Sequence, residues 1–351
     1  MAVSSVAVPD SLAVSCATLP VVAARVLSVL TSVAAHQEQR LRERFCASLS
    51  SFERALFERL CEVPYDSKDW WRGPHDIYVT RVMELIVRRE NCSRTHAGRD
   101  GLLPQWLPCA ALVHDRGYAL LGRFRQLDGA EYLTREGAHW EGSDIRISHA
   151  RLSRRYAGAV LFGIADAELE GLVDTSCLKV EHRIDNPELF LRVVETHDYP
   201  YVGRYEEMPG EARHHFDADS LFSTSVVSFV KDYLAYLRDP KKVRAAIDLG
   251  LGENGVFTPR SLLMVRMARY FETASQLPSG WDLVRFPLTS SANSFAGERC
   301  IRPHSSTAQG LTEVAFEELA RCCTVMEGVS SVERFSEWLY DCIGRQFDAL
   351  F

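Results

Sequence analysis

The sequence predicts an all-α protein, and three observations support this class. Apolar residues recur every three or four positions along several long segments, which is the period of an amphipathic helix. Alternation of apolar and polar residues, which would indicate half-buried strands, is weak throughout the chain. Prolines such as Pro64, Pro200 and Pro240 lie at the ends of the periodic segments, where they can end a helix. We therefore expect a helical bundle with helical extensions at both ends.

The periodic segments predict the helices in chain order. We expect one or two helices over 21–62, one that begins after Gly73-Pro74, one from Pro104 to His114, one over 148–162, one from Pro187 to Pro200, one long helix over 217–238, one over 259–277 and a closing helical segment over 312–351. Gly117 is expected to stop the helix that ends at His114. The stretch 122–142 is rich in glycine and charge and predicts a loop or an insertion.

This order divides the chain into three predicted parts. They are an N-terminal helical extension over 1–69, a core over 70–240 and a C-terminal helical extension over 241–351. The sequence from Gly250 to Gly255 spells GxGxxG, but it follows a helical segment instead of a strand, so we interpret it as a turn. The sequence contains no P-loop and no nucleophile elbow.

Composition and charge exclude several classes of protein. The chain has 351 residues, 46% of them hydrophobic and 25% charged, which is typical of a soluble globular protein. A net charge of −7 gives no general attraction for nucleic acid, although a local pocket could still bind a small phosphorylated substrate. The apolar N-terminus lacks a basic region and is interrupted by Pro9 and Pro20, so we expect neither a signal peptide nor a membrane-spanning helix. Its shortage of acidic residues leaves a transit peptide open.

The cysteines are scattered along the chain. There are ten of them, including the neighbours Cys322-Cys323, and no CxxC motif occurs, which argues against a zinc finger. In a chain of this length without a secretory signal, they predict buried, reduced thiols in a cytoplasmic protein.

A His-Asp pair marks the candidate site. His114-Asp115 ends the apolar run Cys-Ala-Ala-Leu-Val, where a buried charged pair would be costly unless it bound a cation. A lone His-Asp pair is weak evidence, because His114 could simply cap a helix while Asp115 opens a turn. Four other segments, however, carry a ligand-type residue in a similar helical setting: His75, His149, His197 and Asp219.

This order of motifs resembles the HD-domain superfamily over about Gly73 to Leu237. The shared pattern is a His that opens a helix, then apolar-apolar-His-Asp-x-Gly, further His residues on later helices and an Asp in an Asp-x-Leu context. The resemblance implies an HD-type helical metal-binding core. Its first metal would be bound by His75, His114, Asp115 and Asp219, and its second by His149 and His197 together with a bridging Asp115. Such ligands suit two divalent transition metal ions, Fe or Mn first, with Mg, Co, Ni or Zn as alternatives.

Several positions depart from the pattern or leave alternatives open. Tyr118 stands where many hydrolase members have Lys or His, which puts the phosphate-binding role of that position in doubt. Asp217 and Asp219 lie two residues apart and cannot share a helical face, so only one is a ligand. We prefer Asp219 because of its Ala-Asp-x-Leu context and expect Asp217 to be an N-cap.

Other histidines are alternative ligands or surface residues. His182 and His139 could replace His197 and His149 if the register is wrong. The pair His214-His215 is expected at the surface, because adjacent residues on a helix or turn point apart.

Residues near the predicted ligands suggest roles in catalysis and substrate binding. Asp115 and Arg116 are the predicted catalytic residues, and Arg116, Tyr118 and Arg151 are the predicted substrate contacts. A solvated helix face remains the alternative for Arg151 and the arginines that follow it. The Ser153 hydroxyl is expected to pack against a neighbouring helix.

Three functions fit this pattern. The first is metal-dependent hydrolysis of a small phosphate ester or nucleotide, in which two cations activate water. The second is a mixed-valence diiron oxygenase that cleaves a C–C or C–P bond of a small polar substrate, as the resemblance allows. The third is a sensor or scaffold that keeps a metal for stability. We expect a small-molecule substrate, no nucleic-acid or membrane partner, and terminal extensions that are candidates for forming a homodimer.

Overall fold

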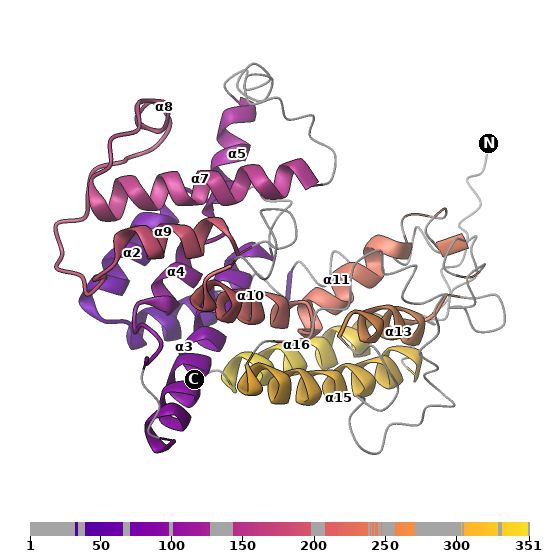
Figure 1. Ribbon diagram of the computed structural model, residues 1–351. Coiled ribbons are helices and arrows are strands. Elements are labelled where there is room, and N and C mark those ends of the chain that lie inside the picture. Colours follow the sequence, from indigo (N-terminus) through magenta and orange to yellow (C-terminus); the bar gives the residue numbers. More distant parts are fainter. Residues whose placement is uncertain are drawn as a thin grey trace, which may run out of the picture. The chain divides into compact units, whose positions relative to one another are not determined.

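The computed structural model describes residues 32–33, 39–65, 71–97, 101–126, 143–197, 208–237, 257–270, 305–328 and 332–349, with Pro303 and isolated residues between 239 and 247. Within these ranges the chain is helical and has no β-strand, which confirms the all-α prediction (Figure 1). The contacts group the chain into two compact units. We call residues 38–222 the core unit and residues 223–349 the C-terminal unit. Their boundary falls inside the predicted core of 70–240.

The core unit is a bundle arranged around one short helix. Its helices are a segment over 39–48, α2 (Ser51–Cys61), α3 (Arg72–His96), α4 (Leu107–Val113), α5 (Arg116–Gln126), α7 (Ser143–Phe162), α8 (Ala167–Glu170), α9 (Pro187–Glu195) and α10 (Gly210–Phe222). Helix α4 packs against α2, α3, α9 and α10, and every one of its residues is buried. A helix this short depends on such packing, because its own hydrogen bonds do not stabilise it in water. The residues that follow α4 are therefore placed inside the bundle.

Local signals define where several of these helices begin. Ser50 and Glu53 form a reciprocal capping box at the start of α2. Asn186 caps α9, and Pro187 occupies its first turn, as the sequence predicts. Asp166 caps α8 in the same way. These caps satisfy amide groups that have no partner within the helix.

Gly117 does not stop a helix, contrary to the prediction. Helix α4 ends at Val113, and Gly117 lies in the first turn of α5, which continues to Gln126 across part of the predicted loop. A Cβ at Gly117 would lie 1.8 Å from the carbonyl oxygen of His149. Its amide donates a hydrogen bond to Ser153 Oγ at 2.7 Å, and this contact confirms the predicted packing role of Ser153. Gly117 is thus needed for the close approach of α5 to α7.

The predicted long helix over 217–238 is two helices, which makes that prediction wrong. Helix α10 ends at Phe222, and α11 spans Val226–Leu237. Three hydroxyl residues separate them, and Ser225 Oγ accepts a hydrogen bond from the amide of Ser228 at 3.1 Å. Serine side chains compete with the helical backbone in this way, so they favour a break and a new cap.

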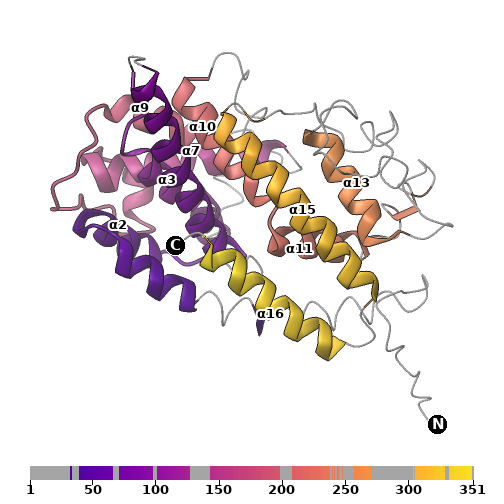
Figure 2. The same ribbon diagram turned by 90° about the horizontal axis from the view of Figure 1, so that it is seen from below.

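The C-terminal unit is built from four described helices. They are α11, α13 (Pro259–Tyr270), α15 (Ser306–Gly328) and α16 (Val332–Asp348), so the closing segment predicted from 312 is two helices (Figure 2). Helix α15 packs against α11 and α13, and α16 packs against α11. Phe229, Phe316 and Phe335 are fully buried. The predicted turn over 250–255 lies outside the described residues.

The length and composition of the described helices bear on a membrane-spanning role. None of them combines the length and the apolar character that crossing a bilayer requires.

Candidate metal centre

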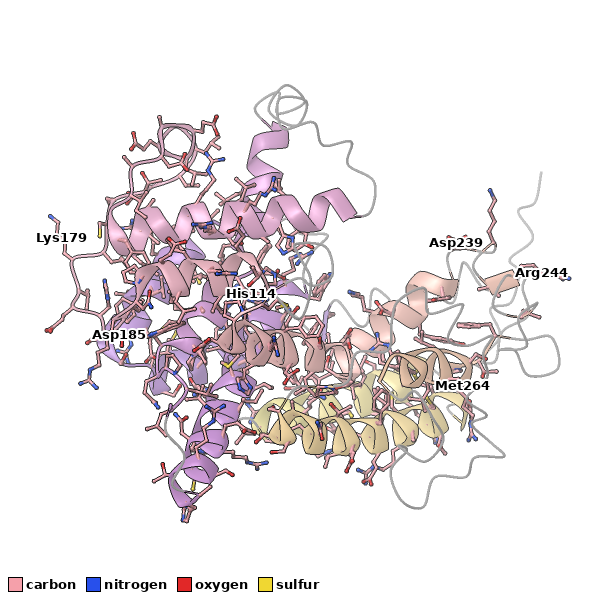
Figure 3. The ribbon with its side chains drawn as sticks, in the orientation of Figure 1. His114, Lys179, Asp185, Asp239, Arg244 and Met264 are labelled. Carbon is pink, nitrogen blue, oxygen red and sulfur yellow. The ribbon has the colours of Figure 1, made fainter. Side chains whose placement is uncertain are left out.

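The structure brings the six predicted ligand residues together from five separate elements of the core unit. His75 lies in the first turn of α3, His114 and Asp115 in the turn between α4 and α5, His149 in α7, His197 just after α9, and Asp219 in α10. All except Asp219 are at most 5% exposed, and the Asp219 side chain is 24% exposed. Figure 3 shows His114 among the helices of this unit, whereas Lys179 points outward. Ligands from separate helices form a rigid site.

The Asp115 carboxylate lies at the centre of the cluster. Its Oδ1 atom is 3.2 Å from His149 Nε2, 3.5 Å from His197 Nε2 and 3.7 Å from His114 Nε2. Its Oδ2 atom is 3.8 Å from His75 Nδ1. One carboxylate therefore faces four imidazoles, as a carboxylate shared by two cations would.

The donor atoms form two groups that share Asp115. His75, His114 and Asp115 each offer a donor atom within 4.8 Å of the others, and so do Asp115, His149 and His197. The Nε2 atoms of His149 and His197 are 3.0 Å apart. Asp219 Oδ1 adds to the first group, because it lies 2.9 Å from His75 Nε2 and 3.5 Å from His114 Nε2. These buried groups could hold metal ions.

The hydrogen bonds of the cluster test whether a cation fits. His114 Nδ1 donates to the Ala111 carbonyl at 2.6 Å, and His197 Nδ1 donates to the Val194 carbonyl at 2.6 Å. These bonds direct both Nε2 atoms toward the carboxylates. His114 Nε2 and His75 Nδ1 are buried, and no described group forms a hydrogen bond with either atom. Unpartnered buried nitrogens are costly, and a cation bound by imidazole and carboxylate would remove that cost.

The electrostatics of the cluster also suit a cation. Burial lowers the pKa of His75 to about 3 and that of His149 to about 4, so both rings are neutral at pH 7, the form that binds metals. Burial opposes the protonation of His114, but Asp115 and Asp219 outweigh it and raise its pKa to about 9. Burial works against ionisation of the two carboxylates as well, yet the charge on His114 helps to lower the pKa of both. The cluster therefore holds two anionic carboxylates.

The side chains of Arg72, Tyr118 and His149 form a stack beside the second group. The sequence analysis did not identify Arg72 as a residue of the site. Arg72 Nη1 donates to Asp115 Oδ2 at 2.8 Å, and its guanidinium lies 3.3 Å from the centre of the Tyr118 ring and 4.4 Å from that of Trp71. The Tyr118 ring stacks on the His149 ring, with centroids 3.9 Å apart. Arg72 precedes His75 by one helical turn, which is the only sequence signal for its role. Tyr118 is half-buried, and its contact with substrate stays a prediction.

Arg116 is paired within the core, which argues against its predicted role as a catalytic and substrate-binding residue. It is 3% exposed, and its Nη2 atom lies 2.7 Å from Asp76 Oδ2. Its Nη1 atom donates to the Leu60 carbonyl at 3.2 Å, and the Tyr65 hydroxyl donates to the same Asp76 oxygen at 2.8 Å. A buried guanidinium requires such partners, so Arg116 joins α5 to α3 and to the end of α2.

Arg151, Arg154 and Arg155 of α7 are not gathered at the cluster. Arg151 is exposed and lies two residues from His149, which places it on a different face of α7. Arg154 pairs with Glu188 and Glu195, and Arg155 pairs with Asp166. Their charges are thus engaged by acidic side chains, which favours the alternative of a solvated helix face.

The surface position expected for His214 and His215 is wrong. They are 2% and 0% exposed, because α10 packs against α3, α4 and α9 and so has an interior on more than one face. The His215 ring lies 5.0 Å from the His114 ring and 5.6 Å from the His197 ring, measured between centroids. Burial lowers the pKa of His215 well below its usual value. The spacing of four residues between His215 and Asp219 was the signal available in the sequence.

Three other positions that the sequence left open are Asp217, His182 and His139. Asp217 is not an N-cap, because α10 begins at Gly210 and Asp217 is buried in its middle. His182 packs against Phe52 and Phe162, both at 5.6 Å between ring centroids, and the contacts described for it are with these rings rather than with the cluster. His139 lies outside the described residues.

The chain matches no protein-family model, no curated protein and no solved structure. Its chemistry therefore has to be argued from the residues of the cluster.

Proposed function

We propose that the chain is an HD-type, binuclear metal-dependent phosphohydrolase that acts on a small phosphate ester or nucleotide. The observation that carries the proposal is the Asp115 carboxylate, which is shared by two groups of imidazoles. Two-metal phosphatases hold their cations about 3.5–4 Å apart, and a shared carboxylate is a means of doing so.

The charge of the cluster supports an anionic substrate. Asp115 and Asp219 supply two negative charges, and an imidazole that binds a cation gives up its proton and is neutral, so the histidines, His114 included, would supply none. Two divalent cations would leave the centre with an excess of positive charge, so a phosphate group could be attracted without a free arginine. Arg116, Arg154 and Arg155 are engaged in ion pairs, and the proposed reaction does not need them to bind phosphate.

The roles of the chain's own residues follow from their contacts. Bound cations would polarise a phosphoryl oxygen and activate water, so no nucleophilic side chain is required. Arg72 holds the Asp115 carboxylate in place through its hydrogen bond to Oδ2. Gly117 brings α5 close to the backbone of His149, and the burial of the imidazoles excludes bulk water from the ligands. Each of these features fixes ligand positions before substrate binds.

A diiron oxygenase is the second candidate, and one arrangement favours it. Four imidazoles surround Asp115, and Tyr118 stacks on His149 in the position where a basic residue would bind phosphate. Iron and manganese select nearly the same ligands, so the same cluster would serve a redox reaction.

The decisive experiment measures phosphate release without oxygen. Protein loaded with Mn should release inorganic phosphate from a panel of nucleotides and phosphomonoesters under anaerobic conditions. His149→Gln should lower the rate by about 100-fold or more, because it removes a ligand of the second group. His182→Gln is the matched control and should retain the rate of the unmodified protein, since His182 packs against Phe52 and Phe162.

Two results would overturn the proposal. Failure across the panel, together with substrate-dependent oxygen uptake by the iron-loaded protein, would establish the oxygenase. Retention of two ions with neither activity would indicate a sensor or scaffold.

A further inference from the structure

His215 is a fully buried histidine beside the metal centre that the six predicted ligands do not include. Its relative exposure is 0%, and neither of its ring nitrogens forms a hydrogen bond with a described group. The Val193 backbone lies near the ring, but no hydrogen bond of normal geometry connects them. A buried imidazole without partners is costly, so its position calls for a ligand.

The surroundings of His215 match those of the predicted ligands. Its ring centroid is 5.0 Å from that of His114. The two rings of the first group, His75 and His114, are 5.1 Å apart, and those of the second group, His149 and His197, are 5.0 Å apart. The His114 and His197 rings, from different groups, are 4.8 Å apart, so this spacing places His215 within the cluster without assigning it to one group.

The helix that carries His215 assigns it to one of the two groups. His215 precedes Asp219 by four residues on α10, so the two side chains lie on the same face of the helix. Asp219 is 2.9 Å from His75 Nε2 and belongs to the first group. The face of α10 that presents Asp219 to this group thus presents His215 as well.

We propose that His215 is an additional protein ligand of the first metal, beside His75, His114, Asp115 and Asp219. The first ion then has five protein ligands, whereas the second has three: Asp115, His149 and His197. A centre enclosed by protein ligands is typical of a structural metal, and a centre with fewer of them keeps positions open for substrate. Substrate therefore binds at the second ion, beside the half-buried Tyr118 ring.

This inference rests on the metal centre of the proposed function and is independent of the reaction. The test is a titration of metal-free protein with Mn or Zn, followed by binding measurements and metal analysis. His215→Gln should weaken the tighter of the two ions by about 10–100-fold or more and leave the weaker one unchanged. Two ions bound as in the unmodified protein would overturn the assignment.

His214 provides the matched control. It is buried and adjacent to His215 in the sequence, but its side chain lies on a different face of α10. His214→Gln should keep both metal affinities, and thermal unfolding measures any loss of stability that the two variants share. If both variants weakened the tighter ion equally, the effect of His215→Gln would be structural and the assignment would fail.

A measurement on the unmodified chain keeps the inference testable if His215→Gln does not fold. A crystal structure of the protein loaded with Zn should place a His215 nitrogen about 2.1 Å from the first ion. If both His215 nitrogens lay outside coordination distance of that ion, the assignment would be overturned. Phosphate release is not measured in these experiments, so an inactive protein whose first ion binds His215 would refute the hydrolase and leave this ligand in place.

Discussion

The two units of this chain bury very different side chains. The interior of the core unit contains arginine, aspartate and histidine side chains, among them Arg72, Asp76 and His114. Among the described residues of the C-terminal unit, Arg266 is the one buried charged side chain, and it is paired with Asp232 at 2.6 Å. Burying ionisable groups is costly unless something compensates for the lost hydration. Their concentration in one unit includes the buried His and Asp groups that could hold metal ions.

The C-terminal unit buries ionisable side chains of another kind, its cysteines. Cys322, Cys323 and Cys342 lie inside the C-terminal unit as free thiols. Burial raises the pKa of all three, that of Cys342 to about 11, so they remain protonated. Protonated thiols behave as small apolar side chains. In this unit burial suppresses ionisation, whereas in the core unit the carboxylates of Asp115 and Asp219 stay charged.

The largest expected effect comes from removing the shared carboxylate. Asp115→Ala should weaken the binding of both ions by more than about 100-fold, whereas His149→Ala or His197→Ala should leave roughly one ion per chain. Metal analysis after dialysis measures this. Asp232→Ala, an equivalent change in the C-terminal unit, should leave the metal content unchanged. Full metal content in Asp115→Ala would mean that the two groups do not share this residue.

A smaller effect is expected from Arg116, which we assign to the packing of the core unit. Arg116→Met should lower the free energy of unfolding by about 3–5 kcal/mol, because it leaves the Asp76 carboxylate buried without its cation. The exposed Arg151, changed to Met, should stay within about 0.5 kcal/mol of the unmodified protein. Denaturant unfolding measures both, and similar values for the two variants would refute the assignment.

The loss of stability in Arg116→Met should depend on pH. Burial raises the pKa of Asp76 to about 6 even with Arg116 beside it, and loss of the guanidinium should raise it further. A protonated Asp76 needs no cation, so the destabilisation by Arg116→Met should be large at pH 8 and shrink toward pH 5. A loss of stability that is independent of pH would show that packing, and not the ion pair, is the cause.

Removal of the metals should have the smallest effect, and it should be confined to one unit. Metal present at 100 times its dissociation constant stabilises a protein by about 2.7 kcal/mol. Chelation should therefore increase hydrogen exchange in α4 and α5, between which His114 and Asp115 lie, and leave α15 and α16 as they were. Equal deprotection of both units would mean that they unfold together.

Part of this structure could be predicted from local sequence. Apolar residues at helical spacing indicate the all-α class, because one face of each helix has to be buried, and Asn186-Pro187 indicates where α9 begins. The six ligand candidates could be selected because His and Asp are unusual within apolar helices, and the structure gathers them. The helix assignments depend only on residues that are close together in the chain, whereas the choice of these six residues also used the order of motifs that resembles the HD-domain superfamily.

Contacts between distant segments decided the rest. Arg116 looked like a substrate contact until Asp76, forty positions earlier, proved to be its partner. Gly117 looked like a helix stop because the residue that it approaches closely, His149, lies on another helix, and the sequence does not show that contact. His215 looked like a surface residue because the sequence alone does not show that α3, α4 and α9 all pack against α10. Local patterns specify which residues share a helical face, but the partner of each face is chosen by packing among elements far apart in sequence.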